Sequence, residues 1–452
     1  MKLDIRVVSQ ETIKPSSPTP NNLFNYNLSF LDQISPPVYN PLILFYPKQI
    51  NHDSKYDDNP STISNLLKQS LSKLLSHYYP LAGRIRDSLV AHCNDEGIPY
   101  LEAQVSCKIS DVLHENSSSQ PNELLGLVPF QLHGGPHDLP LGVQFNVFQC
   151  GGIALGLCMS HKLADASSTI SFVKAWAAMA KGQVDVQAPE FVSSKLFPPR
   201  DMSGFDPKTG IMTTSTEGGG HQVLVKRFVF RGASIEALRA KYGKSRSLEH
   251  KKPPSRIETL SAFIWRRVMT ATSNRGRLLL LLHAVNLRTR MDPALAEHSF
   301  GNYYRVAITV PNVGEEEEEE EEEEGGCLIA EIRDAISGID KGFVKSLQGQ
   351  GGDEHLDYLK QQSEGFVGGE VGFLSFTSLC WFDRYEADFG WGKPLWVGTP
   401  SLSFKNLVVF MDSAHGDGIE ALVHLEEGDM GKLQCDEVLL QYANVIPSSS
   451  SS

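Results

Sequence analysis

Hydrophobic and polar positions repeat with two different periods in the first 180 residues. Over 62–75 apolar residues recur every three or four positions, which predicts an amphipathic helix. Over 143–147 and 153–159 apolar residues instead occupy every second position, the pattern of half-buried strands. A glycine-containing turn separates these two segments. We therefore predict a hairpin that delivers His161 at the end of its second strand, followed by a helix over 166–181.

The regular pattern stops between about residue 182 and residue 220, where prolines and glycines are frequent. Such a stretch is typical of a connection between domains. Beyond it, residues 223–230 predict a strand, and residues 234–242 and 257–270 predict helices. Mixed helices and strands then continue almost to the end of the chain.

A length of 452 residues exceeds what one compact core usually accommodates. Hydrophobic content of 41% and charged content of 21% are ordinary for a globular protein. We therefore predict two domains, residues 1–185 and 221–452, joined by a crossover linker over 186–220.

The formal net charge of −13 comes mostly from ten consecutive glutamates at 315–324, without which the balance would be −3. Runs of one charge sign repel themselves and are usually solvated and disordered. We interpret this run as a tolerated loop insertion. An acidic chain also disfavours a nucleic-acid partner, because affinity for nucleic acid depends largely on contacts with phosphate.

The seven cysteines are scattered and odd in number, and no two of them form a CxxC pair. The opening residues lack the apolar stretch of a secretory signal. The leucine run at 278–282 is far too short to cross a bilayer. We expect a cytoplasmic protein in a reducing compartment, without a membrane partner.

His161 has two readings from the residues alone. A histidine after a strand is often a packing or hydrogen-bonding residue. A neutral imidazole can also accept a hydroxyl proton and return it, as a general base does. Asp165 could be an exposed turn residue or the N-cap of the following helix. A metal site would need a third ligand and helical spacing, so we predict none.

A serine-hydrolase mechanism is not supported, because the sequence contains no G-x-S-x-G motif. Around Ser160, the serine nearest His161, the two glycine positions hold Cys158 and Lys162. Without a nucleophile a covalent acyl-enzyme is not expected. Direct attack of one bound substrate on another needs only positioning and one base.

The segment 388–392 (DFGWG) carries bulky aromatic residues between glycines, which is unlike a loop that cradles phosphate. Glycines permit unusual backbone angles, and Phe389 and Trp391 can bury large surfaces. The segment therefore predicts a rigid structural loop.

Two motifs, HKLAD at 161–165 and DFGWG at 388–392, occur in an order and at a spacing that resemble the plant acyl-CoA-dependent acyltransferases called the BAHD family. Further matches extend the resemblance over essentially the whole chain: the proline-rich opening at 13–20, LDQ at 31–33, YPLAGR at 79–84, NLRTR at 286–290 and FGN at 300–302.

The resemblance implies an α/β fold of the chloramphenicol acetyltransferase-like type, with two similar-sized mixed-sheet domains and a channel at their interface. His161 would lie midway along the channel, with coenzyme A entering one mouth and a small-molecule alcohol the other. The segment 383–402 would pack back on the first domain. The resemblance also implies a monomer that holds no permanent cofactor and uses acyl-CoA as a co-substrate.

The resemblance further implies roles for the motif residues. His161 would be the general base, and Asp165 would be tied to an arginine that keeps the His161 loop in shape. Asp388 would be an ion-pair partner of a distant arginine, with Arg288 and Arg290 as candidates. We count Asp388 among the candidate catalytic residues but expect a structural role for it.

For coenzyme A, the candidates are Lys252, Ser255 and Arg256, together with the neighbouring Lys251. They combine positive charge with the start of the helix predicted at 257–270, and a helix N-terminus favours anions. A solvated basic loop is the alternative reading.

For the acceptor, Thr377 and Ser378 occupy the place where hydroxycinnamoyl-transferring members carry Thr-Ser-Trp, but Leu379 replaces the tryptophan. The opening resembles the branch that acetylates alkaloids and terpenoids. We therefore expect acetyl-CoA and a bulky alkaloid or terpenoid alcohol as substrates. A catalytically inactive relative with a binding or regulatory role, and an N-acyltransferase, are the alternatives.

Overall fold

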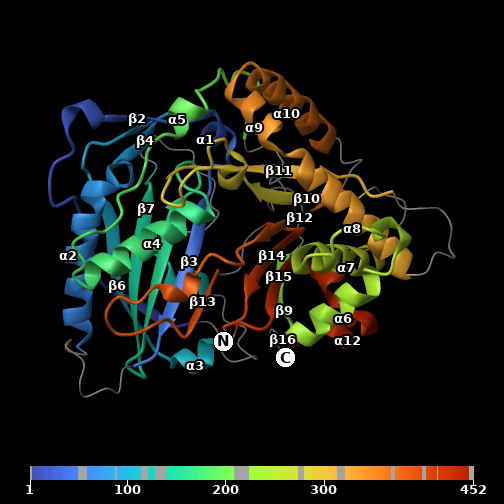
Figure 1. The fold of residues 1–452 in the computed structure, drawn as a ribbon. Helices are drawn as coiled ribbons and strands as arrows, with labels where there is room; N and C mark the ends of the chain where they lie inside the picture. Colours follow the sequence, from blue (N-terminus) through green and yellow to red (C-terminus); the bar gives the residue numbers. More distant parts are fainter. Residues whose placement is uncertain are drawn as a thin grey trace.

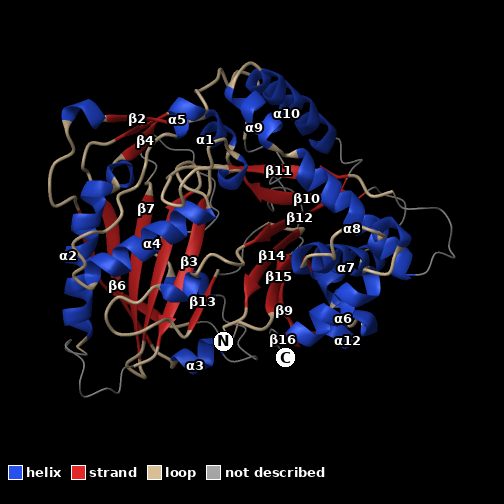
Figure 2. Ribbon diagram, in the orientation of Figure 1, coloured by secondary structure: helices blue, strands red, loops and turns tan. Residues whose placement is uncertain are grey.

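Two β-sheets stand side by side in the computed structural model, and helices cover each of them (Figures 1 and 2). The structure describes most of the chain, in these segments: 3–48, 59–86, 89–113, 121–127, 139–207, 223–272, 279–312, 321–367, 372–399, 404–414 and 416–446.

The first sheet has six strands in the order β1-β6-β7-β8-β3-β13. Their bounds are β1 Ile5–Ile13, β3 Tyr39–Tyr46, β6 Ile98–Val105, β7 Leu141–Phe148, β8 Ile153–Ser160 and β13 Trp396–Gly398. Strands β7 and β8 form the predicted hairpin, which is therefore confirmed. A small separate sheet contains β2 Asn25–Asn27, β4 Arg84–Arg86 and β5 Val90–His92.

Two long helices pack on one face of the first sheet, α2 (Pro60–His77) and α4 (Ala166–Ala180) (Figure 1). Both were predicted and both are confirmed. Their apolar stripes meet the sheet in one core, where Trp176 is fully buried and donates a hydrogen bond to Ser70 Oγ at 3.0 Å. The described residues of this half also form three short helices, α1 Phe30–Ile34, α3 Ile109–Leu113 and α5 Ser193–Leu196.

The second sheet has seven strands in the order β11-β10-β12-β14-β15-β9-β16, with both parallel and antiparallel pairs. Their bounds are β9 Val223–Phe230, β10 Leu279–Asn286, β11 Tyr304–Thr309, β12 Gly372–Ser378, β14 Leu407–Asp412, β15 Ile419–Glu426 and β16 Ala443–Ile446. The strand predicted at 223–230 is confirmed, and the mixed α/β class is confirmed with it.

The predicted helices of the second half are present as α6 (Gly232–Tyr242) and α7 (Arg256–Ala271), which cover one face of the second sheet. The other helices are α8 Glu321–Gly338, α9 Lys341–Gln348, α10 Gly351–Val367, α11 Glu427–Leu433 and α12 Glu437–Tyr442. Single 3-10 turns lie at Asn21–Leu23, Tyr79–Ala82, Pro121–Leu124, Arg246–Leu248, Arg288–Arg290 and Arg384–Glu386. None of the helices in the described segments is both long and apolar enough to cross a bilayer.

The reading of the glutamate run at 315–324 as a loop insertion is wrong for its described part, which forms the first turn of α8. Glu321 pairs with Lys241 at 2.6 Å, and Glu324 pairs with Arg266. Negative charge is favourable at a helix N-terminus, and helices α6 and α7 supply the cations. The rest of the run lies outside the described residues.

One segment of the second half extends the first sheet. Strand β13 pairs antiparallel with β3, so that Val397 lies opposite Leu44. Just before it, the hydroxyl of Tyr46 donates to the Ala387 carbonyl at 2.7 Å. The two halves are therefore interlocked by main-chain hydrogen bonds. The domain boundaries at 185 and 221 stay a prediction, since residues 208–222 lie outside the described part of the chain.

Candidate functional site

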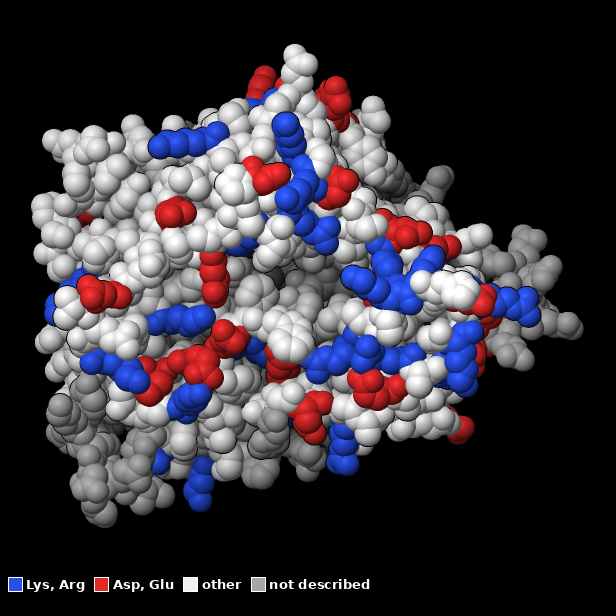
Figure 3. All heavy atoms as spheres, in the orientation of Figure 1, with Lys and Arg blue, Asp and Glu red and all other residues white. Residues whose placement is uncertain are grey.

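A cavity of about 340 Å³ lies between the two sheets and receives residues from both halves. Its walls are mostly apolar, with Leu42 and Ile170 on one side and Leu282 and Val409 on the other. Figure 3 shows the surface hollowed between the two halves. A space of this size and character is typical of small-molecule sites.

A second cavity of about 290 Å³ adjoins the first. Residues that line both are Ala284, Asn286, Phe376, Thr377 and Ser378, at the ends of β10 and β12. The two spaces therefore meet at a common wall, and together they extend the cavity toward the N-terminus of α7, where Ile257 lines the second one.

His161 immediately follows β8 and lines the first cavity. Its backbone N–H donates to the Val38 carbonyl at 2.8 Å, which anchors the residue beside β3. The residue is half-buried, and its ring lies 5.4 Å from the ring of Tyr304 on β11. His161 therefore lies at the boundary between the two halves and contacts residues of both.

The protonation of the His161 ring is set by Asn302. His161 Nδ1 lies 3.0 Å from Asn302 Oδ1. The amide nitrogen of Asn302 donates to the His161 carbonyl at 2.7 Å and to Asp32 Oδ1 at 2.9 Å, so both amide hydrogens are used. Asn302 Oδ1 must then accept, and Nδ1 must carry the ring proton. The lone pair of Nε2 is therefore available as a base.

Burial also favours the neutral ring. Desolvation is the largest effect on His161 and lowers its pKa below 6.5, although Asp165 and the contact with Asn302 act in the opposite direction. The imidazole is thus unprotonated near neutral pH, the form that can accept a proton.

Asp32 anchors this arrangement from the first half. It is fully buried and completes the capping box of α1, whose N-cap is Ser29, by accepting hydrogen bonds from Ser29 N at 2.9 Å and from Ser29 Oγ at 2.7 Å. It also accepts from the backbone N–H of Asn302 at 3.0 Å. Burial raises the pKa of Asp32, and these hydrogen bonds oppose that rise. Asp32 and Asn302 lie in matched motifs, but sequence reasoning assigned neither of them a role.

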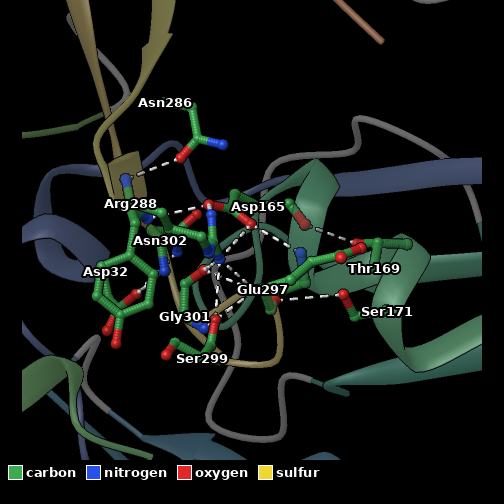
Figure 4. Close-up of polar contacts among 12 residues, drawn as sticks. Asp32, Asp165, Thr169, Ser171, Asn286, Arg288, Glu297, Ser299, Gly301 and Asn302 are labelled. Carbon is green, nitrogen blue, oxygen red and sulfur yellow. Dashed lines mark hydrogen bonds and ion pairs between the residues drawn. The ribbon is translucent and has the colours of Figure 1, made fainter. Parts of the chain in front are cut away.

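Asp165 and Arg288 form a two-pronged ion pair across the halves, with nitrogen–oxygen distances of 2.7 and 3.1 Å (Figure 4). Asp165 also caps α4 by accepting from Ser168 N at 2.9 Å. The exposed-turn reading is wrong, because Asp165 is 6% exposed. Burial alone would raise the pKa of Asp165, but Arg288 and the backbone N–H groups of Ser168 and Tyr303 together outweigh burial and lower the pKa. Arg288 is therefore the arginine tied to Asp165.

Arg288 further donates to the carbonyl of Ser299 at 3.0 Å and to Ser168 Oγ at 3.0 Å (Figure 4). The Ser168 hydroxyl in turn donates to the carbonyl of Gly301 at 2.9 Å. These contacts connect the loop between β8 and α4, which begins at His161, to the segment that carries Asn302. They therefore fix the positions of His161 and Asn302 relative to each other.

The expected pairing of Asp388 with Arg288 or Arg290 is wrong. Arg288 is occupied by Asp165, and Arg290 donates to the Ile336 carbonyl at 3.0 Å. Asp388 instead pairs with Lys181, just past the end of α4, at 2.8 Å. The resemblance pointed to the arginines of the motif at 286–290, whereas the actual partner depends on how the Asp388 loop packs beside the end of α4.

The Asp388 loop is built as a structural unit. Asp388 Oδ1 accepts from the backbone N–H groups of Gly390 and Gly392, each at 2.9 Å, and both glycines have positive φ angles. Phe389 and Trp391 are buried in the core of the first half. Asp388 is not among the residues that line the His161 cavity.

The structure places the candidate coenzyme A residues at the start of α7. Lys252 and Ser255 are exposed, and Ser255 caps α7 in a capping box with Glu258. Arg256 lies 3.7 Å from Asp412. None of the three candidates lines either cavity, although Ile257, which directly follows Arg256, lines the second cavity. Lys and Arg side chains gather over α7 on the face drawn in Figure 3.

The sequence analysis did not identify Arg333, a further cation beside the start of α7. Arg333 of α8 donates to the Lys252 carbonyl at 2.9 Å and pairs with Glu258 at 2.9 Å. Its contribution could not be found from the sequence, because α8 is far from α7 along the chain. Thr377, Ser378 and Leu379 all line the first cavity.

Two interlocked mixed α/β halves enclose a cavity with a histidine at its wall, and this fold matches that of solved acyltransferases. A family model described as the Transferase family matches residues 3–440. The chain belongs to this family, the BAHD acyltransferases, and is an acyltransferase.

Among its relatives, stemmadenine O-acetyltransferase from Catharanthus roseus is 35% identical over 96% of this chain and 97% of its own length. Limonoid 21-O-acetyltransferase from Melia azedarach is 34% identical over 99% of this chain and 100% of its own. The crystal structure of vinorine synthase, an enzyme of Rauvolfia serpentina, superposes with a TM-score of 0.78 at 33% identity, covering 98% of this chain and 99% of that one.

Proposed function

We propose that the protein transfers an acetyl group from acetyl-CoA to a hydroxyl of an alkaloid or terpenoid alcohol, with His161 as the general base. The observation that carries this proposal is the hydrogen bond between His161 Nδ1 and Asn302 Oδ1. It leaves Nε2 unprotonated on a residue that lines the cavity.

The reaction needs one base and good positioning. The acceptor hydroxyl donates its proton to His161 Nε2 while its oxygen attacks the thioester carbonyl carbon. The new C–O bond forms, and collapse of the tetrahedral intermediate breaks the C–S bond. The imidazolium then returns the proton to the departing sulfur of coenzyme A. Asn302 Oδ1 accepts from Nδ1–H throughout, which stabilises the imidazolium.

The two cavities suit the two substrates. The apolar first cavity supports a bulky, mostly hydrophobic acceptor, whose burial would supply most of the binding. The second cavity adjoins Ile257 at the start of α7, where Lys252, Ser255 and Arg256 would meet the coenzyme A phosphates. The acetyl group is supported by the names of the relatives and by Leu379, a cavity residue that stands where hydroxycinnamoyl-transferring members carry a tryptophan.

The test is release of coenzyme A from acetyl-CoA in the presence of a panel of alkaloid and terpenoid alcohols. We expect turnover with at least one alcohol, and His161→Ala should lower it by about 10²-fold or more with an unchanged melting temperature. His77→Ala, at the exposed C-terminal end of α2, is the matched control and should behave as the wild type. Near-normal turnover in folded His161→Ala would exclude His161 as the base.

A further inference from the structure

Arg305 on β11 is a cation of the cavity wall that the proposed reaction does not use. It lines the first cavity, and it is only 8% exposed. No aspartate or glutamate within the described segments forms an ion pair with it. Burial lowers the pKa of Arg305 to about 10, which still leaves the guanidinium charged at neutral pH. Its charge is therefore buried without a counter-ion from the described part of the chain.

The nearest polar partner of Arg305 is a neutral ring. Its Nη2 lies 2.6 Å from Nε2 of His355 on α10. A guanidinium only donates, so His355 Nε2 must accept and the imidazole must be uncharged. Burial and the neighbouring Arg305 charge lower the pKa of His355 to about 3, in agreement with a neutral ring. The buried Arg305 Nε has no hydrogen-bond partner among the residues that the structure describes.

The other charges of this cavity cancel. Asp165 and Arg288 both line it and neutralise each other. His161 and His355 are neutral at physiological pH. One uncompensated positive charge remains in a mostly apolar space, at Arg305. Burying an unpaired charge is costly unless something supplies the opposite charge.

The position of Arg305 separates it from the reacting end of the cavity. The preceding residue, Tyr304, contacts the His161 ring. Successive side chains of a strand point to opposite faces, so Arg305 points away from His161 and toward α10. Strand β11 is the edge strand of its sheet, and the first cavity reaches both of its faces. Arg305 does not line the second cavity, on the proposed coenzyme A side.

We propose that Arg305 binds a carboxylate carried by the acceptor at the end remote from the reacting hydroxyl, so that the acceptor is an apolar hydroxy acid. A guanidinium pairs with a carboxylate through charge-assisted hydrogen bonds, and its free Nε–H supplies one donor. This inference rests on the proposed function for the placement of the hydroxyl at His161. It narrows the acceptor to alcohols that also bear an acid.

The probes are ω-hydroxyalkanoic acids of graded chain length and their methyl esters, which differ only in the negative charge. Binding to the full-length protein is measured by calorimetry without any acyl-CoA, and transfer is measured separately with acetyl-CoA. At the best chain length we expect the acid to bind more tightly than its ester. Arg305→Met should weaken acid binding by about 10- to 100-fold and leave ester binding little changed.

Two further variants keep the result interpretable. Arg305→Lys retains the charge and should keep part of the preference for the acid. Arg267→Met is the matched control, because Arg267 on α7 is a similarly buried arginine that lies 3.7 Å from Asp436 and does not line either cavity. It should leave the ratio of acid to ester binding as in the wild type.

Equal binding of acid and ester by the wild type would overturn the proposal, as would equal weakening of both ligands in Arg305→Met. Arg305-dependent transfer from malonyl-CoA to neutral alcohols would overturn it too, by assigning the carboxylate to the acyl group. Arg305-dependent binding of the acid without any release of coenzyme A would support the carboxylate site and count against the proposed acetyl transfer instead.

Discussion

The motif loops at 161–165 and 388–392 each contain an aspartate in an ion pair, and the two ion pairs differ in burial and in role. Asp165 is buried and pairs with Arg288 from the other half, beside the histidine of the cavity. Asp388 pairs with Lys181 near the surface and caps the backbone of its own loop. A motif aspartate is therefore best understood by what surrounds it, since burial and partners decide what its removal would cost.

The largest effect on stability is expected for Asp165→Ala. Removing one partner of a buried ion pair leaves Arg288 charged and unpaired, which costs roughly 3 to 5 kcal/mol of unfolding free energy. The N-cap of α4 is lost as well. Chemical denaturation measures the effect, and turnover per folded molecule should fall with it. A loss below about 1 kcal/mol would show that the Asp165 pair is no stronger than a surface pair.

Asn302→Ala tests the tautomer of His161 through the pH profile. The wild-type rate should be constant above the pKa of His161 and fall as the pH drops through it, at a midpoint below 6.5, because only the neutral ring accepts a proton. The contact with Asn302 raises this pKa, so the variant should have its midpoint at lower pH. We also expect turnover to drop about 10-fold or more. An unmoved midpoint would mean that Asn302 does not contact the ring in the active enzyme.

Asp388→Ala should destabilise the protein less than Asp165→Ala does. The variant leaves the Gly390 and Gly392 N–H groups without their acceptor, which costs about 1 to 3 kcal/mol. Melting temperature and activity should fall together, since Asp388 does not line the cavity. A variant of unchanged thermal stability and abolished chemistry would instead place Asp388 in the reaction.

The smallest effect is expected for Lys181→Ala. Its side chain is 39% exposed, and half-exposed ion pairs contribute about 0 to 1 kcal/mol. Lys181→Ala removes only the ion pair, whereas Asp388→Ala also removes the acceptor of the Gly390 and Gly392 N–H groups. The difference in unfolding free energy between the two variants therefore measures the contribution of these backbone hydrogen bonds. Equal destabilisation by the two substitutions would make the Lys181 contact the principal role of Asp388.

Local patterns in the sequence determined much of this protein. In helices α2 and α4 and in the β7–β8 hairpin, the spacing of apolar residues along the chain reflects which side chains face the core. These elements could therefore be predicted from the sequence alone. The two motifs were sufficient to place the chain among the acyltransferases. They also identified Asp165 as a residue tied to an arginine.

Only the tertiary structure decided the partners. Arg288 pairs with Asp165 and not with Asp388, Asn302 contacts His161 across 141 positions, and the first glutamates of α8 find cations on α6 and α7. The pairing of strand β13 with β3 of the first sheet is another such contact. These contacts connect residues far apart in sequence, so they depend on how the two halves pack. The unpaired charge of Arg305 is likewise visible only in the folded chain, where burial and neighbours are defined.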